Sequence, residues 1–479
     1  MNAQEIVETN APARLDRLPW SRFHWMVIVA LGVAWILDGL EVTLVGALSG
    51  VLADHRALGL SEAQVGLSAS AYLVGAVLGA VGFGRLSDAF GRRRLFFVTV
   101  GLYLGATVAS GLAWNFAAFA VCRFFTGAGI GGEYAAINSA VQELIPARRR
   151  GVTDLTINGS WWVGAALGAV ASVVVLDEHV FPVWLGWRVA FLVGAALGVV
   201  IISIRRLIPE SPRWLMTHGR ADEAHAVIAE IEAGVAAQGQ AVEPAESAEV
   251  IRLVASARGG WLDVARTLVL TYPRRTFVGL SLMASQAFCY NAIFFTYALI
   301  LTNFYAVPAA SVGWYLLPFA VGNFFGPLLL GRLFDSVGRR VMIGGTYALS
   351  GILLALTGWL FAHGLLTAVE QTAAWTVIFF FASAAASAGY LTVGESFPIE
   401  IRAVAIALFY AVGTGVGGVV APALFGRLIE DKSRPELFIG YLVGAAAMLA
   451  AAVIEAILGI DAERKPLESV AAPLSLARD

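Results

Sequence analysis

Twelve long apolar runs restrict the fold of this chain more than any other feature of its sequence. A helix needs about 20 mostly apolar residues to cross a lipid bilayer. The runs that meet this length are approximately 25–52, 63–84, 95–113, 115–142, 155–176, 186–208, 275–303, 311–331, 341–362, 373–394, 403–428 and 438–459. They lack the alternating pattern that a membrane β-barrel requires. With 58% hydrophobic and 14% charged residues in 479, the chain is predicted to be an all-α membrane protein with twelve transmembrane helices.

Arginine placement predicts the orientation of these helices. Short arginine runs follow spans two, four, six and eight, at 92–94, 148–150, 205–206 and 339–340. These loops share one side, so the positive-inside rule places that side and both termini in the cytoplasm. The loop that contains Arg427, Lys432 and Arg434 is the exception, because it falls on the outer side. The first apolar run is too long for a signal peptide and lacks a small-residue cleavage site, so we expect it to stay as span one.

A polar stretch divides the chain into two halves. We predict a cytoplasmic N-terminal segment, a six-helix bundle, a cytoplasmic linker with amphipathic helices, a second six-helix bundle and a cytoplasmic tail, at 1–24, 25–208, 209–272, 273–459 and 460–479. Ala224, Val227, Ile228 and Ile231 share one face of a linker helix. A second surface helix is predicted over 261–270, after a flexible connector around Pro244.

A near-duplicated decapeptide relates the halves to each other. Residues 84–93 read GRLSDAFGRR, and residues 331–340 read GRLFDSVGRR. Each copy falls between two spans on the arginine-rich side, where its glycines permit a tight connection and its arginines can pair with a carboxylate. Such a cluster favours a latch that breaks and reforms, although a simple positive-inside anchor is the alternative.

A second parallel extends this predicted gate. ELIP from Glu143, with Arg150 beyond it, matches ESFP from Glu395, with Arg402 beyond it. Each half thus carries a carboxylate able to meet its own arginine loop. The predicted cytoplasmic gate comprises Gly84, Asp88, Gly91, Arg92, Arg93, Glu143, Arg150, Gly331, Asp335, Gly338, Arg339, Arg340, Glu395 and Arg402.

With these motifs, the chain resembles the major facilitator superfamily, within its branch of sugar porters and metabolite–proton symporters. The resemblance also rests on RFFTGAGIGGE from Arg123 and PESPRWL from Pro209, and it covers nearly the whole chain. It implies two pseudo-symmetric six-helix bundles with a central site between them. The bundles rock against each other, and this motion opens the site to each side of the membrane in turn.

Ionisable residues inside predicted spans are candidates for proton coupling. A charge at the centre of a membrane helix costs about 2.5–3.5 kcal/mol on insertion scales and is seldom present without a role. Span one carries Asp38 and Glu41, and span four carries Arg123 and Glu133. Burial raises a carboxyl pKa and a nearby arginine lowers it, so a pair that opens and closes can exchange a proton. By resemblance to proton-linked porters, Glu41 and Arg123 are that pair. The alternative is a permanent ion pair, with Asp38 capping a broken helix or lining the cavity.

Substrate contacts follow from the resemblance. SQAFCYNAIFFTY in span seven resembles the sugar-porter segment that faces the sugar, which points to Gln286 and Asn291, and Tyr390 occupies the place of a cavity tryptophan. Span five adds Asn158 and Trp161. Ser285 replaces that segment's second glutamine, which argues against a hexose. GIGGEY, which ends at Tyr134, is closer to metabolite–proton symporters of organic acids or zwitterions. For Trp161 and Tyr390, a packed or lipid-facing position is the alternative.

Several other functions find no support in the sequence. GxGxxG occurs at 127–132 and 413–418, but inside apolar helices rather than after a strand, so close helix packing is the better interpretation. Small residues four apart also occur at 75/79, 164/168 and 322/326. Cys122 and Cys289 lack metal-ligand spacing. We therefore expect no cofactor, no metal site, no nucleic-acid partner and no enzymatic activity.

The sequence thus predicts a multi-pass secondary transporter of the cytoplasmic (inner) membrane. It would import a small polar metabolite, an organic acid or sugar-like, together with a proton, by alternating access. Its partners would be substrate, proton and lipid bilayer, and one chain would function as a monomer. A proton-coupled exporter of drugs or metabolites is the first alternative. A non-transporting nutrient sensor is less favoured, because the tail after Ile460 has only about twenty residues.

Overall fold

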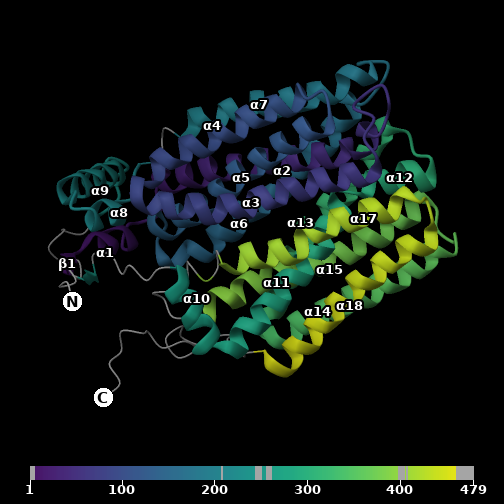
Figure 1. Ribbon diagram of the computed structural model, residues 1–479. Coiled ribbons are helices and arrows are strands. Elements are labelled where there is room, and N and C mark those ends of the chain that lie inside the picture. Colours follow the sequence, from purple (N-terminus) through teal and green to yellow (C-terminus); the bar gives the residue numbers. More distant parts are fainter. Residues whose placement is uncertain are drawn as a thin grey trace.

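The structure is a computed structural model, which describes residues 6–205, 209–242, 251–254, 261–397, 405 and 408–459. Long helices lie side by side in two groups, one from the first half of the chain and one from the second (Figure 1). The first group contains α2 (Arg22–Leu52), α3 (Glu62–Phe90), α4 (Arg92–Gly111), α5 (Phe116–Leu144), α6 (Ala147–Val175) and α7 (Val183–Arg205). The second contains α11 (Pro273–Phe294), α12 (Tyr297–Tyr305), α13 (Val312–Ser336), α14 (Arg339–Ala362), α15 (Ala368–Glu395), α17 (Val420–Glu430) and α18 (Arg434–Leu458).

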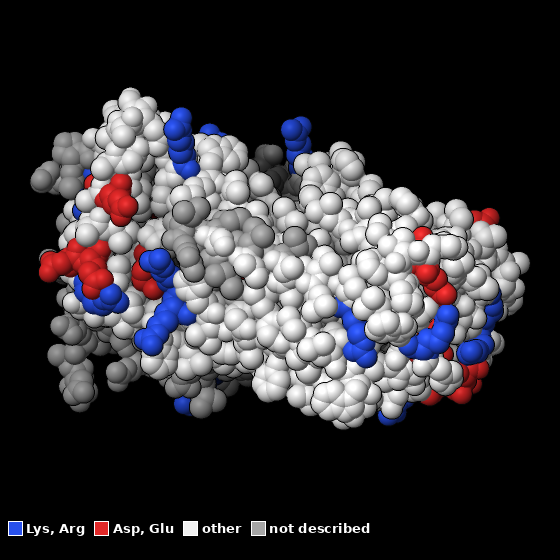
Figure 2. All heavy atoms as spheres, turned by 90° about the horizontal axis from the view of Figure 1, so that it is seen from above, with Lys and Arg blue, Asp and Glu red and all other residues white. Residues whose placement is uncertain are grey.

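The helices have the length and composition of membrane spans. Within the described residues, ten are long and apolar enough to cross a membrane, and Val183–Ala196 in α7 is a shorter apolar helix. Charged side chains gather mainly toward the two ends of the molecule, and the broad band between them holds few (Figure 2). An uncharged band between charged ends matches a bilayer between two aqueous phases. The all-α membrane fold is therefore confirmed, whereas the count of twelve spans and the cytoplasmic termini stay predictions.

One predicted span is interrupted, and another contains a π-helical segment. Span seven was predicted over 275–303, but α11 ends at Phe294 and α12 begins at Tyr297. Between them, the Thr296 hydroxyl donates a hydrogen bond to the Ala292 carbonyl, a contact that competes with the helical backbone bonds and bends helices. Span eleven contains a π-helix, η3 (Thr414–Gly418), directly before α17. Such one-turn π segments occur often at functional sites.

Glycines allow the helices of the first group to pack closely, as predicted. A Cβ built on Gly75 of α3 would lie 1.9 Å from the Phe124 carbonyl oxygen of α5. A Cβ on Gly127 of α5 would lie equally close, at 1.9 Å, to the Tyr72 carbonyl oxygen of α3. Each glycine thus admits the backbone of the opposite helix, which is the usual basis of tight membrane-helix pairs. In the second half Gly415 is different, because nothing lies within 4 Å of its Cβ position.

The two groups of helices contact each other near the end that carries α12, here called the far end. A Cβ on Gly66 of α3 would lie 2.2 Å from the Pro422 carbonyl oxygen of α17, and one on Gly313 of α13 would lie 2.0 Å from the Ala169 carbonyl oxygen of α6. The Ser70 hydroxyl also donates to the Val419 carbonyl across this interface, at 2.6 Å. The far end is therefore closed by direct backbone contact between the groups.

Short elements form a small module at the opposite end, here called the linker end (Figure 1). They are β1 (Ile6–Thr9), α1 (Ala11–Asp16), α8 (Pro212–Thr217), α9 (Ala221–Ala236) and β2 (Ile251–Val254). A further short helix, α10 (Trp261–Leu270), packs instead against the second group of helices. The predicted amphipathic helix is α9, which buries Ala224, Ile228, Ile231 and Val235 against α1 and α8. The predicted second surface helix is α10.

The N-terminal segment is part of this module, which the sequence did not indicate. β1 pairs with β2 in an antiparallel ladder, with Ile6 opposite Val254. Both nitrogen donors of the Arg14 guanidinium fork reach the carboxylate of Glu232 on α9, at 2.9 and 2.6 Å. Residues 6–16 are thereby fixed to segments more than 200 positions away.

Arg434, the most buried cation of the exceptional outer loop, has a structural explanation. Its guanidinium donates to the Phe361 and Phe304 carbonyls, at 3.0 and 3.1 Å. The guanidinium carbon also lies 4.7 Å from the centre of the Phe361 ring, within the range of a cation–π contact. Arg434 therefore connects α12, α14 and α18 at the far end. This structural role explains why an arginine occurs in a loop that the positive-inside rule places on the outer side.

Candidate transport site

Glu41 of α2 and Arg123 of α5 form an ion pair inside the first group of helices. Arg123 Nη1 lies 3.3 Å from Glu41 Oε1, and their side chains are only 1% and 3% exposed. The Thr107 hydroxyl of α4 donates to the same Glu41 oxygen at 3.3 Å. Tyr103 of α4 is a further polar neighbour of Glu41. Glu41 Oε2 and Arg123 Nη2 are buried and make no hydrogen bond of good geometry in the described residues. The pair is therefore incompletely satisfied, which is expensive in a low-dielectric interior.

Aromatic rings complete the surroundings of Arg123. Its guanidinium carbon lies 4.7 Å from the centre of the Tyr72 ring and 5.8 Å from that of Phe191. These contacts favour the charged arginine without neutralising it. Arg123 thus holds a permanent positive charge beside a carboxylate that can exist in two protonation states. The sequence did not indicate Thr107 or Tyr72, because a threonine and a tyrosine in a membrane helix are common packing residues.

Asp38 and Glu133 occupy different positions from Glu41. Asp38 precedes Glu41 by nearly one turn of α2 and is 1% exposed. It lies within electrostatic range of three tyrosines, Tyr72, Tyr103 and Tyr410. Because Tyr410 belongs to the second half of the chain, Asp38 faces the interface between the halves. Glu133 is fully buried but lies ten residues from Arg123 on α5, a distance of about 15 Å along the helix.

Glu41 itself faces the interior of the first group rather than the other half. Its partners come from α4 and α5, and a Cβ on Gly194 of α7 would lie 3.8 Å from its Cγ. The structure therefore brings Glu41 and Arg123 together, as the sequence predicted, and Asp38 and Glu133 both lie within electrostatic range of Tyr103, as Glu41 does. Asp38 lies within electrostatic range of Tyr410 in the other half, and at the far end the Glu62 carboxylate accepts a hydrogen bond from Asn303 of α12 at 3.3 Å.

Aromatic side chains meet across the two halves beside these charges. The Trp161 ring of α6 lies 5.6 Å from the Phe294 ring of α11, and the Trp162 ring lies 6.2 Å from the Tyr290 ring. The Tyr290 hydroxyl donates to Oδ1 of the buried Asn323 on α13 at 2.7 Å. Trp161 thus lies at the interface, as a substrate contact would. The sequence did not indicate Tyr290 or Asn323, since only tertiary contact distinguishes them from packing residues.

The other predicted substrate contacts have mixed positions. Gln286 and Asn291 are half-buried on α11, and the Asn291 amide donates to the Ala287 carbonyl at 2.7 Å. Asn291 also lies against Gly418, where a Cβ would approach its amide nitrogen to 3.0 Å. Asn158 is half-buried on α6. The side chain of Tyr390 lies outside the described residues.

The two repeated loops have the same backbone geometry. Gly91 has a φ of 91° directly before α4, and Gly338 has a φ of 114° directly before α14. Only glycine adopts these angles readily, so each second glycine of the repeat is required for the turn. The first glycines, Gly84 and Gly331, lie within α3 and α13 instead, as do Asp88 and Asp335. Our expectation that Gly84 forms part of the tight connection was therefore wrong.

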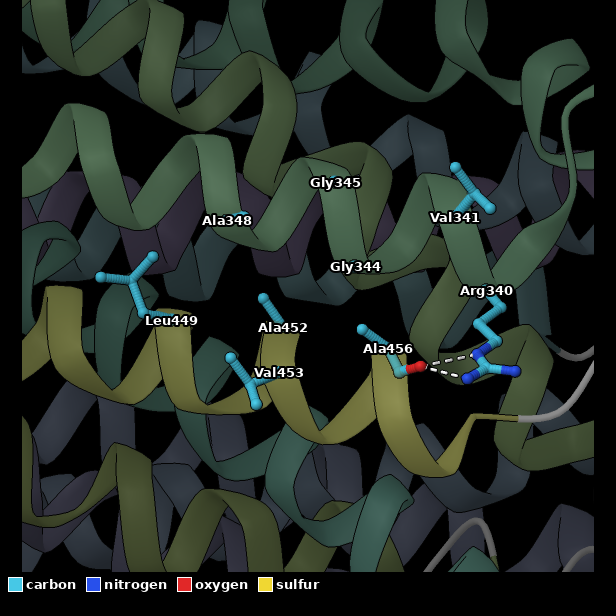
Figure 3. A pocket seen from close by; sticks show the side chains of 9 residues that line it. All are labelled: Arg340, Val341, Gly344, Gly345, Ala348, Leu449, Ala452, Val453 and Ala456. Atoms are coloured by element: carbon cyan, nitrogen blue, oxygen red, sulfur yellow. Dashed lines mark hydrogen bonds between the residues drawn. The ribbon is translucent and has the colours of Figure 1, made fainter.

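The loop before α4 has a carboxylate partner that we did not predict. Glu210 of the PESPRWL motif accepts the Arg93 backbone N–H, at 3.3 and 3.2 Å to its two oxygens. A negative charge here also suits the positive end of the helix dipole. In the second repeat, Arg340 donates instead to the Ala456 carbonyl of α18, and Arg339 is buried (Figure 3).

The remaining gate residues cannot be placed in these contacts. The side chains of Asp88, Arg92, Glu143, Arg150, Asp335 and Glu395, and all of Arg402, lie outside the described residues. Within the described part of the chain, no group of three or more histidine, cysteine, aspartate or glutamate residues could hold a metal ion.

Comparison with known proteins identifies the family of this chain. Residues 26–469 match the family described as "Sugar (and other) transporter". The chain belongs to this family of the major facilitator superfamily, and it is a multi-pass membrane transporter rather than an enzyme.

Individual relatives match either nearly the whole chain or about half of it. The niacin transporter NiaP of Acinetobacter baylyi is 27% identical over 468 residues, which cover 96% of this chain and 99% of that protein. The inner membrane metabolite transport protein YgcS of Escherichia coli K12 is 30% identical over 219 residues, or 46% of this chain and 48% of that protein.

Solved structures share the fold. The inward open conformation of the xylose transporter XylE from E. coli has a TM-score of 0.73 at 17% identity, and covers 93% of this chain and 98% of that one. A D-xylose-proton symporter has a TM-score of 0.71 at 18% identity, with 92% and 99% covered.

Proposed function

We propose that this transporter imports a small polar metabolite together with a proton across the cytoplasmic membrane, as a monomer. Glu41 carries the proton, and Arg123 sets when it is released. The observation that carries the proposal is the buried, incompletely satisfied Glu41–Arg123 pair. In hydrocarbon, an acid and a base that only lock two helices would be replaced by apolar residues at little loss.

The proposed cycle depends on the separation of this pair. When Arg123 lies beside Glu41, its charge favours the ionised carboxylate. When the halves tilt and α5 moves relative to α2, the buried carboxylate loses that support and takes up a proton. One proton moving down a membrane potential contributes about 2.3 kcal/mol per 100 mV, which drives accumulation without ATP.

Substrate is proposed to bind between the halves, where Trp161 meets Phe294. Asn158, Gln286, Asn291 and Tyr390 would supply polar contacts at this level, and Asp38 a charge. The names of two relatives, a niacin transporter and a D-xylose-proton symporter, give a first pair of substrates to try. The repeated loops at the linker end would form the gate on that side, with Gly91 and Gly338 as their turns.

The test is transport by purified protein in proteoliposomes with an imposed pH gradient. Radiolabelled niacin and D-xylose are the probes, and a pH-sensitive dye reports proton entry. Wild type should accumulate one of them and carry protons with it, whereas Glu41→Gln should lose accumulation and retain exchange at equal concentrations. Glu430→Gln, an exposed acid at the end of α17, is the control. Accumulation by Glu41→Gln at the wild-type level would transfer the coupling role elsewhere, first to Asp38 and Glu133. Proton entry coupled to substrate efflux would identify an exporter.

A further inference from the structure

A groove runs between α14 and α18 on the outer surface of the second group of helices (Figure 3). It has a volume of about 640 Å³. Its floor consists of small residues, Gly344, Gly345 and Ala348 on α14 and Ala452 and Ala456 on α18. Val341 and Val453 on its walls are 63% and 56% exposed. Because both helices have the composition of membrane spans, the groove opens toward lipid.

Open space lies beside the two glycines that line the groove. A Cβ built on Gly345 meets no heavy atom within 4 Å, and one on Gly344 meets only the Ala452 carbonyl oxygen at 3.6 Å. By contrast, a Cβ on Gly351, two turns farther along α14, would lie 2.9 Å from the Leu449 side chain. The helices therefore pack tightly beyond the groove, whereas Gly345 faces open space beside it.

Two arginines define the polar mouth of the groove. Nε of Arg340 donates to the Ala456 carbonyl at 2.9 Å, and another nitrogen of its guanidinium points away from that carbonyl (Figure 3). Arg274 of α11 donates to the next carbonyls of α18, at Leu458 and Ile457, at 3.1 and 3.3 Å. The mouth thus carries two full positive charges, while the rest of the groove is apolar.

The length of the groove matches one leaflet of a bilayer. From Arg340 to Ala348, α14 advances about 12 Å at its usual rise of 1.5 Å per residue. Half of a hydrocarbon core measures about 15 Å. An acyl chain in the groove would therefore reach toward the bilayer centre when its headgroup phosphate lies beside Arg340.

We propose that the α14–α18 groove is a binding site for an anionic phospholipid, with one acyl chain over Gly344 and Gly345 and the headgroup phosphate at Arg340 and Arg274. Basic pockets between membrane helices are known to favour anionic headgroups. This site is distinct from the transport site, because its lining residues come from α14 and α18 alone, whereas Glu41, Arg123 and Trp161 lie on α2, α5 and α6.

Native mass spectrometry of the purified full-length protein tests the proposal. Protein is titrated with phosphatidylglycerol or phosphatidylcholine of identical acyl chains. From the contribution of a single cation near a lipid phosphate, wild type should retain about fivefold more of the anionic lipid. Gly345→Leu should lose this excess, because its side chain occupies the groove without striking the protein. Arg340→Gln should lose part of this excess, and Arg274→Gln/Arg340→Gln should bind the two lipids nearly equally.

Two further variants serve as a control and as a replacement. Gly105→Leu on α4 is the matched control, because Gly105 is also exposed and nothing lies within 4 Å of its Cβ position; it should bind lipid as wild type does. Val453→Trp fills the groove from α18 and replaces Gly345→Leu if that variant fails to fold.

Four outcomes would overturn the proposal. The anionic excess could persist in both groove-filling variants, or both lipids could bind wild type equally. Inorganic phosphate alone could displace the lipid completely, which would leave a headgroup site without a chain site. A dimer of wild type that Gly345→Leu dissociates would make the groove an interface between two copies of the chain.

Discussion

Glu41 and Arg123 lie 82 residues apart in sequence, and Arg123 Nη1 lies 3.3 Å from Glu41 Oε1 inside the first group of helices. Both side chains are almost fully buried. This contact joins α2 to α5, and it leaves one polar atom of each residue without a hydrogen bond of good geometry in the described residues. A charge that loses its counter-ion in such a place is more costly than a pair that is removed as a whole.

We therefore expect non-additive stabilities at this pair. Arg123→Gln should lower the free energy of unfolding by about 3–5 kcal/mol, because it leaves Glu41 without a counter-charge. The double variant Glu41→Gln/Arg123→Gln should recover part of that loss. Thermal unfolding in detergent, followed by intrinsic tryptophan fluorescence, measures the cycle. Strictly additive losses would show that the two side chains act independently.

Closure of the far end should be sensitive to Gly66. A Cβ there would lie 2.2 Å from the Pro422 carbonyl oxygen, so Gly66→Val should hold α3 and α17 apart. We expect at least a tenfold loss of uptake and faster maleimide labelling of a cysteine placed at Ser70. Gly101→Val, on an open face of α4 with nothing within 4 Å, is the control. Unchanged labelling would mean that the halves do not close through this contact.

The attachment of the N-terminal segment should depend on Arg14 and Glu232. Their paired contacts at 2.9 and 2.6 Å are mostly shielded from water, and a hydrogen bond to a charged group contributes about 1.5–3 kcal/mol. Arg14→Met should therefore speed hydrogen exchange in residues 6–18 by tenfold or more. The exposed pair Arg220–Glu223 provides the control, because Glu223→Gln should leave exchange in this segment unchanged.

Tyr290 should contribute to stability through its hydroxyl. Asn323 is 1% exposed and accepts from Tyr290 at 2.7 Å, so Tyr290→Phe leaves a buried amide oxygen with one partner fewer. The expected loss is about 1–3 kcal/mol. Tyr315→Phe is the control, since the Tyr315 hydroxyl has no hydrogen bond among the described residues. Equal melting temperatures for Tyr290→Phe and wild type would contradict this role.

The loop between α2 and α3 should respond to acid. Hydrogen bonds from Arg56 hold the pKa of Asp54 below its ordinary value of 3.8, and Arg56 also pairs with Glu178 at 3.0 Å. Because the folded pKa is depressed, this stabilisation is present above pH 3.8 and is lost as the pH falls through the folded value. Hydrogen exchange of residues 53–60 should therefore quicken below about pH 4. In Arg56→Gln, the same quickening should begin at higher pH; identical profiles would refute the assignment.

The sequence was most informative about features whose energetic cost depends on a single segment of the chain. An apolar run of about 20 residues has few alternatives to a membrane helix, and α9 followed from the spacing of its apolar residues. Glu41 and Arg123 stood out because ionisable residues are rare in such runs. The turn glycines Gly91 and Gly338 were identified by the repeat, although the sequence did not show that Gly84 lies inside a helix.

Other features depended on contacts that no local pattern contains. Thr296 bends span seven through a single side-chain hydrogen bond, and threonine is too common in membrane helices to signal this. Glu210 became a partner of the first arginine loop because the chain returns to α4 after six helices. Likewise, β1 finds β2 across more than 240 residues.

By itself, then, the sequence determined which segments enter the membrane, which residues carry charge into it, and that the chain contains a duplication. These properties follow from hydrophobicity and spacing along a single helix. The tertiary structure decided which way each helix turns its faces: Glu41 toward Arg123, Asp38 toward the other half, and Gly345 toward lipid. Helix rotation is fixed by close backbone contacts such as Gly75 with Phe124, and such contacts arise only when two helices pack against each other.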